Sequence, residues 1–338
     1  MPSLTTLLSL PNELFLSNIF IHFDLIDLLK LFSSTQNQRL KSLVSATLYT
    51  RMSIDLIRTE VRYSLLLSFL PPENNIITVR INNNQLNETL AAALVKACPK
   101  LTRMEVIVLH EQPRQSLFSI LWTMNLDSLT LSSISDDQND MLSYVCNPQC
   151  TLRCLTVTED NNPIHKPLVD LFDCYNDRLT YLSIAAVDLN VVASLLCHFP
   201  ALETLKLRLP QRRQCTASHP REYRDEDHRS SQWSTRLRLL SIVAPQPYTR
   251  VTLSFYDFVR RFASSLERLS FYLTPLYRKM TPVALERELL TQLPRLKQLD
   301  FCIHTGPCYP NEDDARHLFD QWAVDQRHVV SIYHVPGT

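Results

Sequence analysis

Two groups of cysteine and histidine residues have the side chains that hold metal ions in proteins. Cys146, Cys150 and Cys154 recur every four residues, and Cys302-x-His304-x-x-x-Cys308 forms the second group. Structural zinc sites also use thiolates and imidazoles, but their ligands come as two closely spaced pairs. Neither group has that paired pattern. We therefore expect these cysteines to be packing or surface residues, and we expect no metal site.

Catalytic loops that depend on glycine are close to excluded, because the chain has only Gly306 and Gly337. A phosphate-binding loop needs glycine for close approach of the backbone, and a serine-hydrolase elbow reads Gly-x-Ser-x-Gly. Carboxylate pairs at 136–137 and 313–314 stand at predicted helix starts, where negative charge is favourable without catalysis. Nine cysteines and ten histidines leave a Cys–His nucleophile pair open, but no local signature favours one. We expect no enzymatic activity and no cofactor.

The composition bounds the class of protein and its partners. Hydrophobic residues make up 45% of the 338 residues and charged residues 20%, so a sizeable core can form. Basic and acidic residues both number 34, and such a neutral chain has no overall field that attracts nucleic acid or anionic membrane. No apolar run reaches the roughly 20 residues of a membrane span, and the N-terminus lacks the basic start of a signal peptide. These features predict a cytoplasmic or nuclear protein with reduced thiols.

A Leu-x-x-Leu-x-Leu pattern, with other apolar residues allowed, recurs nine times from Ile76 onward. Most copies begin about 23–30 residues apart, in or near the period of leucine-rich repeats, while one gap, from Leu202 to Leu237, is 35 residues long. Chance would not repeat the pattern so regularly. The copies are Ile76/Val79/Ile81, Leu101/Met104/Val106, Leu126/Leu129/Leu131, Leu152/Leu155/Val157, Leu179/Leu182/Ile184, Leu202/Leu205/Leu207, Leu237/Leu240/Ile242, Leu266/Leu269/Phe271 and Leu296/Leu299/Phe301.

The spacing inside each copy predicts a strand, and the spacing between copies predicts a helix. The fourth and sixth residues of a copy alternate as on one face of a strand, with the first residue packing beneath them. Apolar residues between copies have helical spacing, and proline precedes three copies, at Pro99, Pro200 and Pro294, where it would end the helix. Four of the helical stretches are Leu90/Leu94/Val95, Leu117/Ile120/Leu121, Val191/Val192/Leu195/Leu196 and Leu285/Leu289/Leu290.

The pattern resembles leucine-rich repeats, which implies an α/β solenoid over 73–338 with parallel strands on the concave face and helices outside. The family's asparagine, three residues after the last apolar residue of the motif, is mostly absent, and only the first copy has it, at Asn84. An irregular solenoid, like the intracellular class of variable repeat length, is therefore expected. The stretch 210–235 has five arginines, four acids and almost no apolar residues, which predicts an exposed loop in place of a helix.

The first 50 residues have a different pattern, of three short helices. One begins around Leu10-Pro11-x-Glu13-Leu14, with proline near its first turn; a second begins near Asp24, a candidate cap; and a third spans 37–44. The motif pieces, which continue through Ile19-Phe20, Asp24-x-x-Asp27-Leu28-Leu29 and Asn37-x-Arg39-Leu40, resemble the F-box over residues 7–50. One departure is Leu40, where the family usually has an aromatic residue.

The resemblance implies a role, because F-box proteins bind the Skp adaptor of cullin–RING ubiquitin ligases and present substrates through a C-terminal domain, often leucine-rich repeats. Burial of a few apolar side chains, each worth about 1.5–3 kcal/mol, would suffice for adaptor binding before association costs. The other interpretation is that these leucines only hold the bundle together. The residues implied at the adaptor interface, or directly beneath it, are Leu10, Pro11, Leu14, Ile19, Leu28, Leu29 and Leu40.

Residues 51–72 look like a helix that links the bundle to the repeats, since Ile54, Ile57, Val61 and Leu65 form an apolar stripe and Pro71-Pro72 closes it. On the repeat strands, the residues between the core positions should face outward on the concave side. Arginine and tyrosine are frequent in binding hot spots. The candidate substrate-binding residues, for an acidic or phosphorylated protein, are Tyr181, Lys206, Arg208, Arg268 and Tyr272; a merely solvated face is the alternative.

Together these features predict the substrate-recognition subunit of a Skp–cullin–F-box ubiquitin ligase, which binds the adaptor through residues 7–50 and a protein substrate through the repeats. The alternative is a leucine-rich-repeat scaffold or inhibitor unconnected to ubiquitination, in which the N-terminal helices only cap the solenoid. Either role is one of protein binding without chemistry, and neither needs nucleic acid, a membrane or a cofactor.

Overall fold

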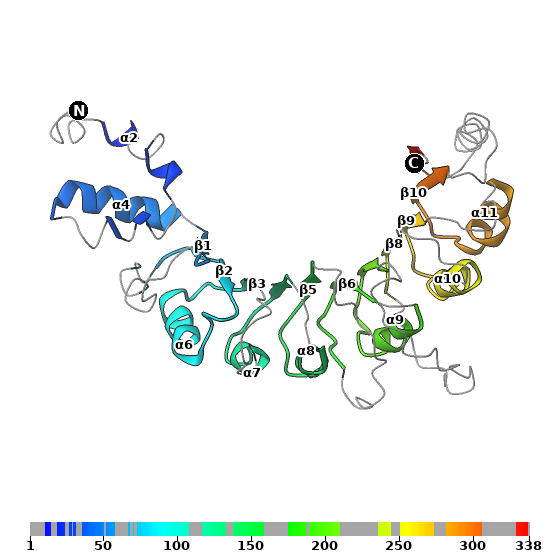
Figure 1. Ribbon diagram of the computed structural model, residues 1–338, viewed down its shortest axis with the longest axis horizontal. Coiled ribbons are helices and arrows are strands. Elements are labelled where there is room, and N and C mark those ends of the chain that lie inside the picture. The colour runs from blue at the N-terminus through cyan, green and yellow to red at the C-terminus, as the bar shows by residue number, and fades with distance from the viewer. Residues whose placement is uncertain are drawn as a thin grey trace. The chain divides into compact units, whose positions relative to one another are not determined.

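The computed structural model in Figure 1 divides the chain into two compact units, Met1–Asp140 and Met141–Thr338. The structure describes residues 11–14, 19–23, 27–28, 30–31, 36–50, 52–57, 67, 70, 73–107, 117–132, 138–158, 175–186, 189–209, 236–244, 251–273, 282–305 and 329–336.

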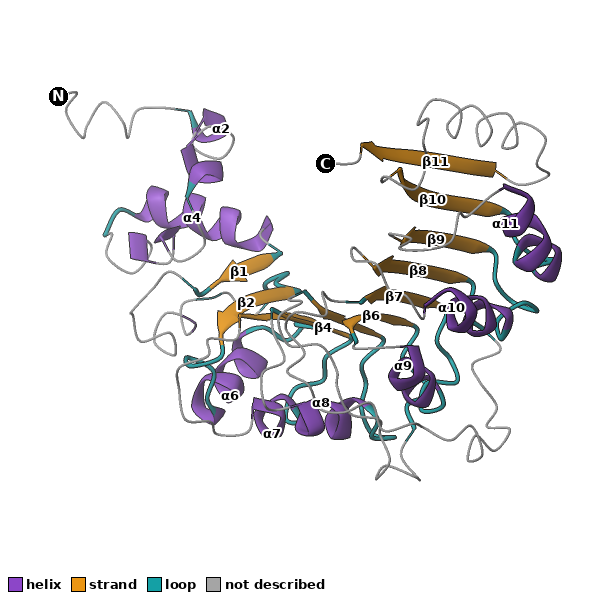
Figure 2. Ribbon diagram, turned by 45° about the vertical axis from the view of Figure 1, so that its right-hand side comes forward, coloured by secondary structure: helices purple, strands orange, loops and turns teal. Residues whose placement is uncertain are grey.

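The first unit begins with short helices and continues as a parallel sheet. Neighbouring strands pair in the order β1-β2-β3-β4, each parallel to the next. The helices that follow β2 and β3 both lie on one side of these strands (Figures 1 and 2). The elements are α2 (Asn12–Leu14), the 3₁₀ turn η2 (Phe20–His22), α4 (Gln38–Thr50), β1 (Ser53–Asp55), β2 (Thr78–Asn82), α6 (Glu88–Ala97), β3 (Arg103–Ile107), α7 (Leu117–Leu121) and β4 (Ser128–Leu131).

The second unit has the same construction. Its strands pair in parallel in the order β5 to β11, and its helices again share one side of the strands (Figure 2). The division between the units falls inside α8 (Gln138–Val145). The other elements are β5 (Cys154–Val157), β6 (Tyr181–Ala185), α9 (Leu189–Leu196), β7 (Thr204–Arg208), β8 (Leu239–Ala244), α10 (Val251–Arg260), β9 (Arg268–Leu273), α11 (Pro282–Glu288), the 3₁₀ turn η5 (Leu290–Gln292), β10 (Gln298–Thr305) and β11 (Val329–Pro336).

The core of each unit is built from the repeated apolar positions. All three apolar positions of every predicted copy, from Ile76 to Phe301, are buried, and none is more than 9% exposed. The fourth and sixth positions share one face of the strand and pack under the helices, as their period-two spacing predicts. The chain is therefore an α/β protein with parallel strands, and the predicted strands and three of the four predicted helices are confirmed. The fourth, Leu285/Leu289/Leu290, is confirmed in part, because α11 ends at Glu288 and Leu290 begins a 3₁₀ turn.

A shared backbone contact keeps neighbouring copies in register. At each junction from β1 to β4, and from β5 to β10, one carbonyl just before a strand accepts hydrogen bonds from two successive N–H groups before or at the start of the next. Thus the Arg238 carbonyl accepts from Glu267 and Arg268, at 2.9 Å each, and the Glu267 carbonyl accepts from Lys297 and Gln298. Backbone groups that a turn would otherwise bury without a partner are satisfied in this way.

The linking helix predicted over 51–72 is wrong at its start, where residues 53–55 form strand β1. Ile54 pairs with Val79 of β2 and is 1% exposed, and Leu56 is 0% exposed. Residues 51–56 therefore form an additional copy of the pattern, with arginine at the first position. The apolar stripe was misleading because Ile54 fits both a helical and a strand period. Residues 58–66 and the predicted loop at 210–235 lie outside the described residues.

The N-terminal helical elements agree only in part with the predicted three helices. The third predicted helix is present as α4, which is longer than expected, and Asn37 caps it by accepting a 3.1 Å hydrogen bond from the Leu40 N–H. The first is the single turn α2, held to α4 by hydrogen bonds of 3.0 and 2.8 Å from the Arg39 guanidinium to the Asn12 side chain. Residues 24–26, where the second was expected to begin, lie outside the described residues.

Candidate protein-binding site

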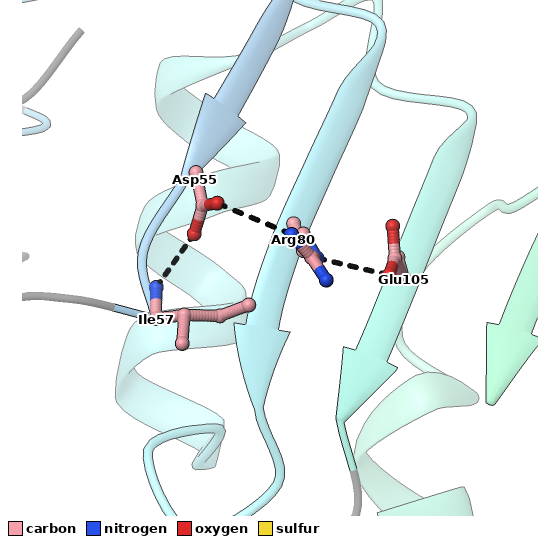
Figure 3. A network of polar contacts seen from close by, with 4 residues as sticks. All are labelled: Asp55, Ile57, Arg80 and Glu105. Carbon is pink, nitrogen blue, oxygen red and sulfur yellow. Dashed lines mark hydrogen bonds and ion pairs between the residues drawn. The ribbon is translucent and has the colours of Figure 1, made fainter. Parts of the chain in front are cut away.

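The strands have an open face, which carries the residues between the core positions. In the first unit its centre is an ion-pair network of three strands, with Arg80 between Asp55 and Glu105 (Figure 3). The guanidinium lies 3.6 Å from the Asp55 carboxylate and 2.9 Å from that of Glu105, and Asp55 also accepts a 2.9 Å bond from the Ile57 N–H. Because its neighbours compensate Arg80, this part of the open face presents little net positive charge.

The five predicted substrate-binding residues all lie on the open face of the second unit, on strands β6, β7 and β9. Lys206 and Arg208 of β7 and Arg268 of β9 are exposed, while Tyr181 of β6 and Tyr272 of β9 are half-buried. The structure brings two of them together, since the Lys206 ammonium lies 5.5 Å from the centre of the Tyr181 ring, within range of a cation–π interaction. Their binding role stays a prediction.

Strand β8 separates the basic residues, and it contributes two apolar side chains that the sequence did not single out. Leu239 pairs in register with Thr204 and Arg268, and Val243 pairs with Arg208 and Tyr272. Both are half-buried on the open face, although the three residues that alternate with them are fully buried in the core. In the sequence, these two residues are apolar at positions that should face outward. Such a residue is easily mistaken for one more residue of the core.

Charges also alternate along the residues that precede the strands, in the order Glu203, Arg238, Glu267 and Lys297. The Lys297 ammonium donates a 2.7 Å hydrogen bond to the Glu267 carboxylate. This bond holds the pKa of the Glu267 carboxyl below its usual range, and the nearby Arg238 and Arg268 charges lower it further. Solvent screens the pair, so it contributes little to folding stability.

Replacing Lys297 with methionine should move the pKa of Glu267 upward, toward that of an ordinary glutamate. The carboxylate is favoured in the folded protein, so the interaction is present above the unfolded-state pKa and is lost as pH falls through the folded-state pKa. Titration of the Glu267 carboxyl carbon by NMR measures the shift. Arg238→Met is the matched control and should raise the pKa less, and an unchanged pKa in Lys297→Met would show that the hydrogen bond is not formed.

The predicted adaptor-binding residues divide into exposed and buried groups. Pro11 is exposed, Leu14 is 39% exposed, and Ile19 and Leu40 are half-buried, whereas Leu28 is 0% exposed and belongs to the core. Leu10 and Leu29 lie outside the described residues. Phe23, which the motif did not single out, is 38% exposed and packs edge-on against the buried Phe20. The exposed apolar side chains available to a partner are thus Leu14 and Phe23, and Leu28 is not among them.

Three cysteines of the described residues, Cys98, Cys146 and Cys150, are buried in the core. Cys146 and Cys150 are buried, and burial raises the pKa of Cys150, which exchanges a hydrogen bond with Tyr144; Cys154 is half-buried on β5. Burial also raises the pKa of Cys98 to about 12, which keeps that thiol protonated at neutral pH. Within the described residues no group of side chains could hold a metal ion, and Cys308 lies outside them.

No family model matches the chain, and no curated protein sequence is similar to it. The candidate site therefore stands on its own geometry, a parallel open face with basic, aromatic and apolar residues on four neighbouring strands. No helix among the described residues is long and apolar enough to span a membrane.

Proposed function

We propose that the chain is the substrate-recognition subunit of a Skp–cullin–F-box ubiquitin ligase, with a leucine-rich-repeat solenoid as its substrate-binding domain. The observation that carries the proposal is the order of the parts: helices with an F-box-like motif and an exposed leucine precede parallel strands with an open face. Such a subunit performs no chemistry and acts by holding its substrate near the ligase. The substrate is an acidic or phosphorylated protein that contacts Tyr181, Lys206, Arg208, Arg268 and Tyr272.

The repeated junction contacts support the solenoid part of the proposal. In a repeat protein each unit contacts only its neighbours, so the same contact recurs from unit to unit. The carbonyl that accepts two N–H groups recurs in this way along both described stretches of strands, even across the gap between Glu203 and Arg238. An ordinary α/β sheet with crossing connections would not place every strand beside its sequence neighbour, as the orders β1 to β4 and β5 to β11 do.

The exposure of Leu14 supports the adaptor part of the proposal. Leu14 ends the single turn α2, which the Arg39 guanidinium holds to α4 through the Asn12 side chain, and the leucine side chain is 39% exposed. A turn that is already ordered loses less conformational entropy on binding, which increases affinity. Leu28, in contrast, is already buried, so it is not available for direct contact with a partner.

Replacing Leu14 with alanine should weaken capture of the Skp adaptor about tenfold or more, since a central apolar contact of an interface commonly costs above 1 kcal/mol when truncated. The measurement is co-purification of the adaptor with the full chain, followed by titration. Val95→Ala is the matched control, because Val95 is a similarly exposed apolar residue, at 46%, on α6. It should leave capture unchanged.

Failure of the intact chain to capture the adaptor would contradict the ligase proposal and favour the alternative of a repeat-protein scaffold or inhibitor. Equal capture of the adaptor by the wild type and by Leu14→Ala would mean that this leucine does not contribute to adaptor binding. The thermal unfolding midpoint of each variant should match the wild type, since both side chains are exposed.

A further inference from the structure

The open face of β7, β8 and β9 combines apolar and basic side chains without any acidic one. The outward residues of β7 are Thr204, Lys206 and Arg208, and those of β9 are Arg268, Ser270 and Tyr272. Those of β8 are Leu239, Ser241 and Val243. The three strands therefore contribute a formal charge of +3 from one lysine and two arginines, around a half-buried apolar stripe. Carboxylates that border the patch include Asp300 of β10, in register with Ser270, and Glu267, which precedes β9.

The register fixes how charge and apolar surface alternate in the patch. Leu239 stands beside Arg268, and Val243 stands between Arg208 and Tyr272. Ser241, at the centre, stands beside Lys206 and Ser270. Each apolar residue thus has an arginine as its in-register neighbour, and the two apolar residues lie about 13 Å apart along the strand at roughly 3.3 Å per residue.

The spacing of the basic groups distinguishes among anionic ligands. Lys206 and Arg208 are two residues apart on one strand, about 7 Å. Arg268 lies two strands away in register with Thr204, so its backbone is about 12 Å from that of Lys206 and about 16 Å from that of Arg208. Carboxylates on several residues of a peptide match three cations spread over this distance, whereas a single phosphate group would require all three side chains to converge on one point. Half-buried apolar side chains between the cations likewise favour a ligand that has apolar side chains of its own.

The described residues of the first unit have a different combination of charges on their open face. There the arginine at the centre of the open face lies between two carboxylates, Asp55 and Glu105, at 3.6 and 2.9 Å (Figure 3). An acidic ligand would meet repulsion from these carboxylates. The open face of β7, β8 and β9, where basic residues flank an apolar stripe, is therefore the better match for an anionic partner.

We propose that the patch of β7, β8 and β9 binds an acidic, non-phosphorylated peptide segment, with two apolar side chains on Leu239 and Val243 and carboxylates on Lys206, Arg208 and Arg268. The inference rests on the proposed function, in that this segment belongs to the ligase substrate. It deepens that function by naming the substrate class. The apolar contacts supply affinity, and the carboxylates supply specificity and speed of association.

Selection from a library of random peptides of about 16 residues, displayed without phosphorylation and captured by the full chain, tests the inference. Enriched peptides should contain Asp and Glu on both sides of two apolar residues. These should lie about four residues apart in an extended peptide, or about nine apart in a helical one. No enrichment, or enrichment of peptides without acidic residues, would overturn the proposal.

Charge reversal gives the sharper arm of the experiment. The double variant Arg208→Glu/Arg268→Glu should bind an enriched peptide at least about tenfold more weakly, and should regain affinity for the same peptide with its acids changed to lysine. Arg295→Glu, a matched change at an exposed turn residue of the same unit, should bind as the wild type does. Equal binding by the double variant and the wild type would overturn the proposal.

A second variant tests the apolar stripe without a change of charge. Leu239→Ser/Val243→Ser should lower the affinity for the same peptide about tenfold. Unchanged affinity would mean that Leu239 and Val243 do not contact the peptide, which would overturn the proposal. Adaptor capture is measured on every variant. If the wild type captures the adaptor but enriches no acidic peptide, this inference alone is refuted, and if the wild type binds the peptide but does not capture the adaptor, the ligase proposal alone is refuted.

Discussion

Replacing Asn176 with alanine should lower the free energy of unfolding of the second unit by about 3–5 kcal/mol. The side chain is 0% exposed. Its amide donates a 2.9 Å hydrogen bond to the Val145 carbonyl at the end of α8, and its carbonyl accepts bonds of 2.8 and 3.1 Å from the Arg178 and Leu179 N–H groups. Alanine would leave the Val145 carbonyl and the Leu179 N–H buried without their partner, at about 1–3 kcal/mol each, and would also remove the bond to the part-buried Arg178 N–H.

The effect should be large because Asn176 connects three consecutive copies of the repeat. Its side chain reaches α8, which precedes β5, while its own N–H donates a 2.8 Å bond to the His198 carbonyl, in the turn between α9 and β7. In a repeat protein the interfaces between neighbours supply much of the stability. Loss of this side chain therefore weakens one interface directly and loosens the loop that forms the next.

Urea unfolding followed by circular dichroism measures the change, and Asn84→Ala is the control. Asn84 occupies the position of the asparagine of leucine-rich repeats, but its side chain is exposed. Its removal should cost less than about 0.5 kcal/mol, as for most surface substitutions. Equal effects of the two variants would mean that the buried hydrogen bonds of Asn176 do not contribute as the geometry indicates.

Asn74 has the same role in the first unit, although the position three residues after the last apolar residue of a copy mostly lacks asparagine. It is also 0% exposed, donates a 2.6 Å bond to the Ala97 carbonyl at the end of α6, and accepts from the Ile76 N–H at 3.2 Å. Both asparagines precede the first apolar residue of a copy, instead of following its last. A search for asparagine at the usual position misses them, because a lone asparagine before an apolar residue reads as an ordinary turn.

A strand could be predicted wherever the first, fourth and sixth residues of a copy are all apolar, because burial of these three residues defines the fold. The two strands that were missed, β1 and β11, belong to copies with arginine at the first position, Arg51 and Arg327. β1 stands first and β11 last in the strand order, so among the described strands each has one neighbour. A terminal copy has less apolar surface to bury, so its sequence is less constrained by the core pattern.

The face of the strands that carries the candidate site could be predicted from the sequence, but the contacts between its residues on neighbouring strands could not. Alternation on a strand suffices to put Tyr181, Lys206 and Arg208 on the open face. The approach of Lys206 to Tyr181 and the position of Val243 between Arg208 and Tyr272 depend on the register of neighbouring strands. That register is set by loop lengths and backbone contacts at the junctions, which no single copy of the motif contains.

Replacing Phe271 with alanine should destabilise the second unit by about 3–5 kcal/mol. Its ring is 2% exposed, stacks on Phe301 of β10 with 5.5 Å between centroids, and meets Phe255 of α10 edge-on at 5.4 Å. Alanine would leave a cavity between two strands and a helix, and large-to-small changes of a buried phenylalanine cost this much. Phe271→Leu fills most of the space and should cost about 2 kcal/mol or less. Urea unfolding measures both.

Tyr272 is the natural control for Phe271, because the neighbouring residue faces the other side of the strand. It is half-buried on the open face, so Tyr272→Ala should change the free energy of unfolding by about 1 kcal/mol or less. It should nevertheless weaken binding of the acidic peptide, because it stands beside Val243. Phe271→Leu should have the opposite profile, with reduced stability and unchanged peptide affinity. If the two variants behaved alike in both measurements, the division of β9 into a core face and a binding face would be wrong.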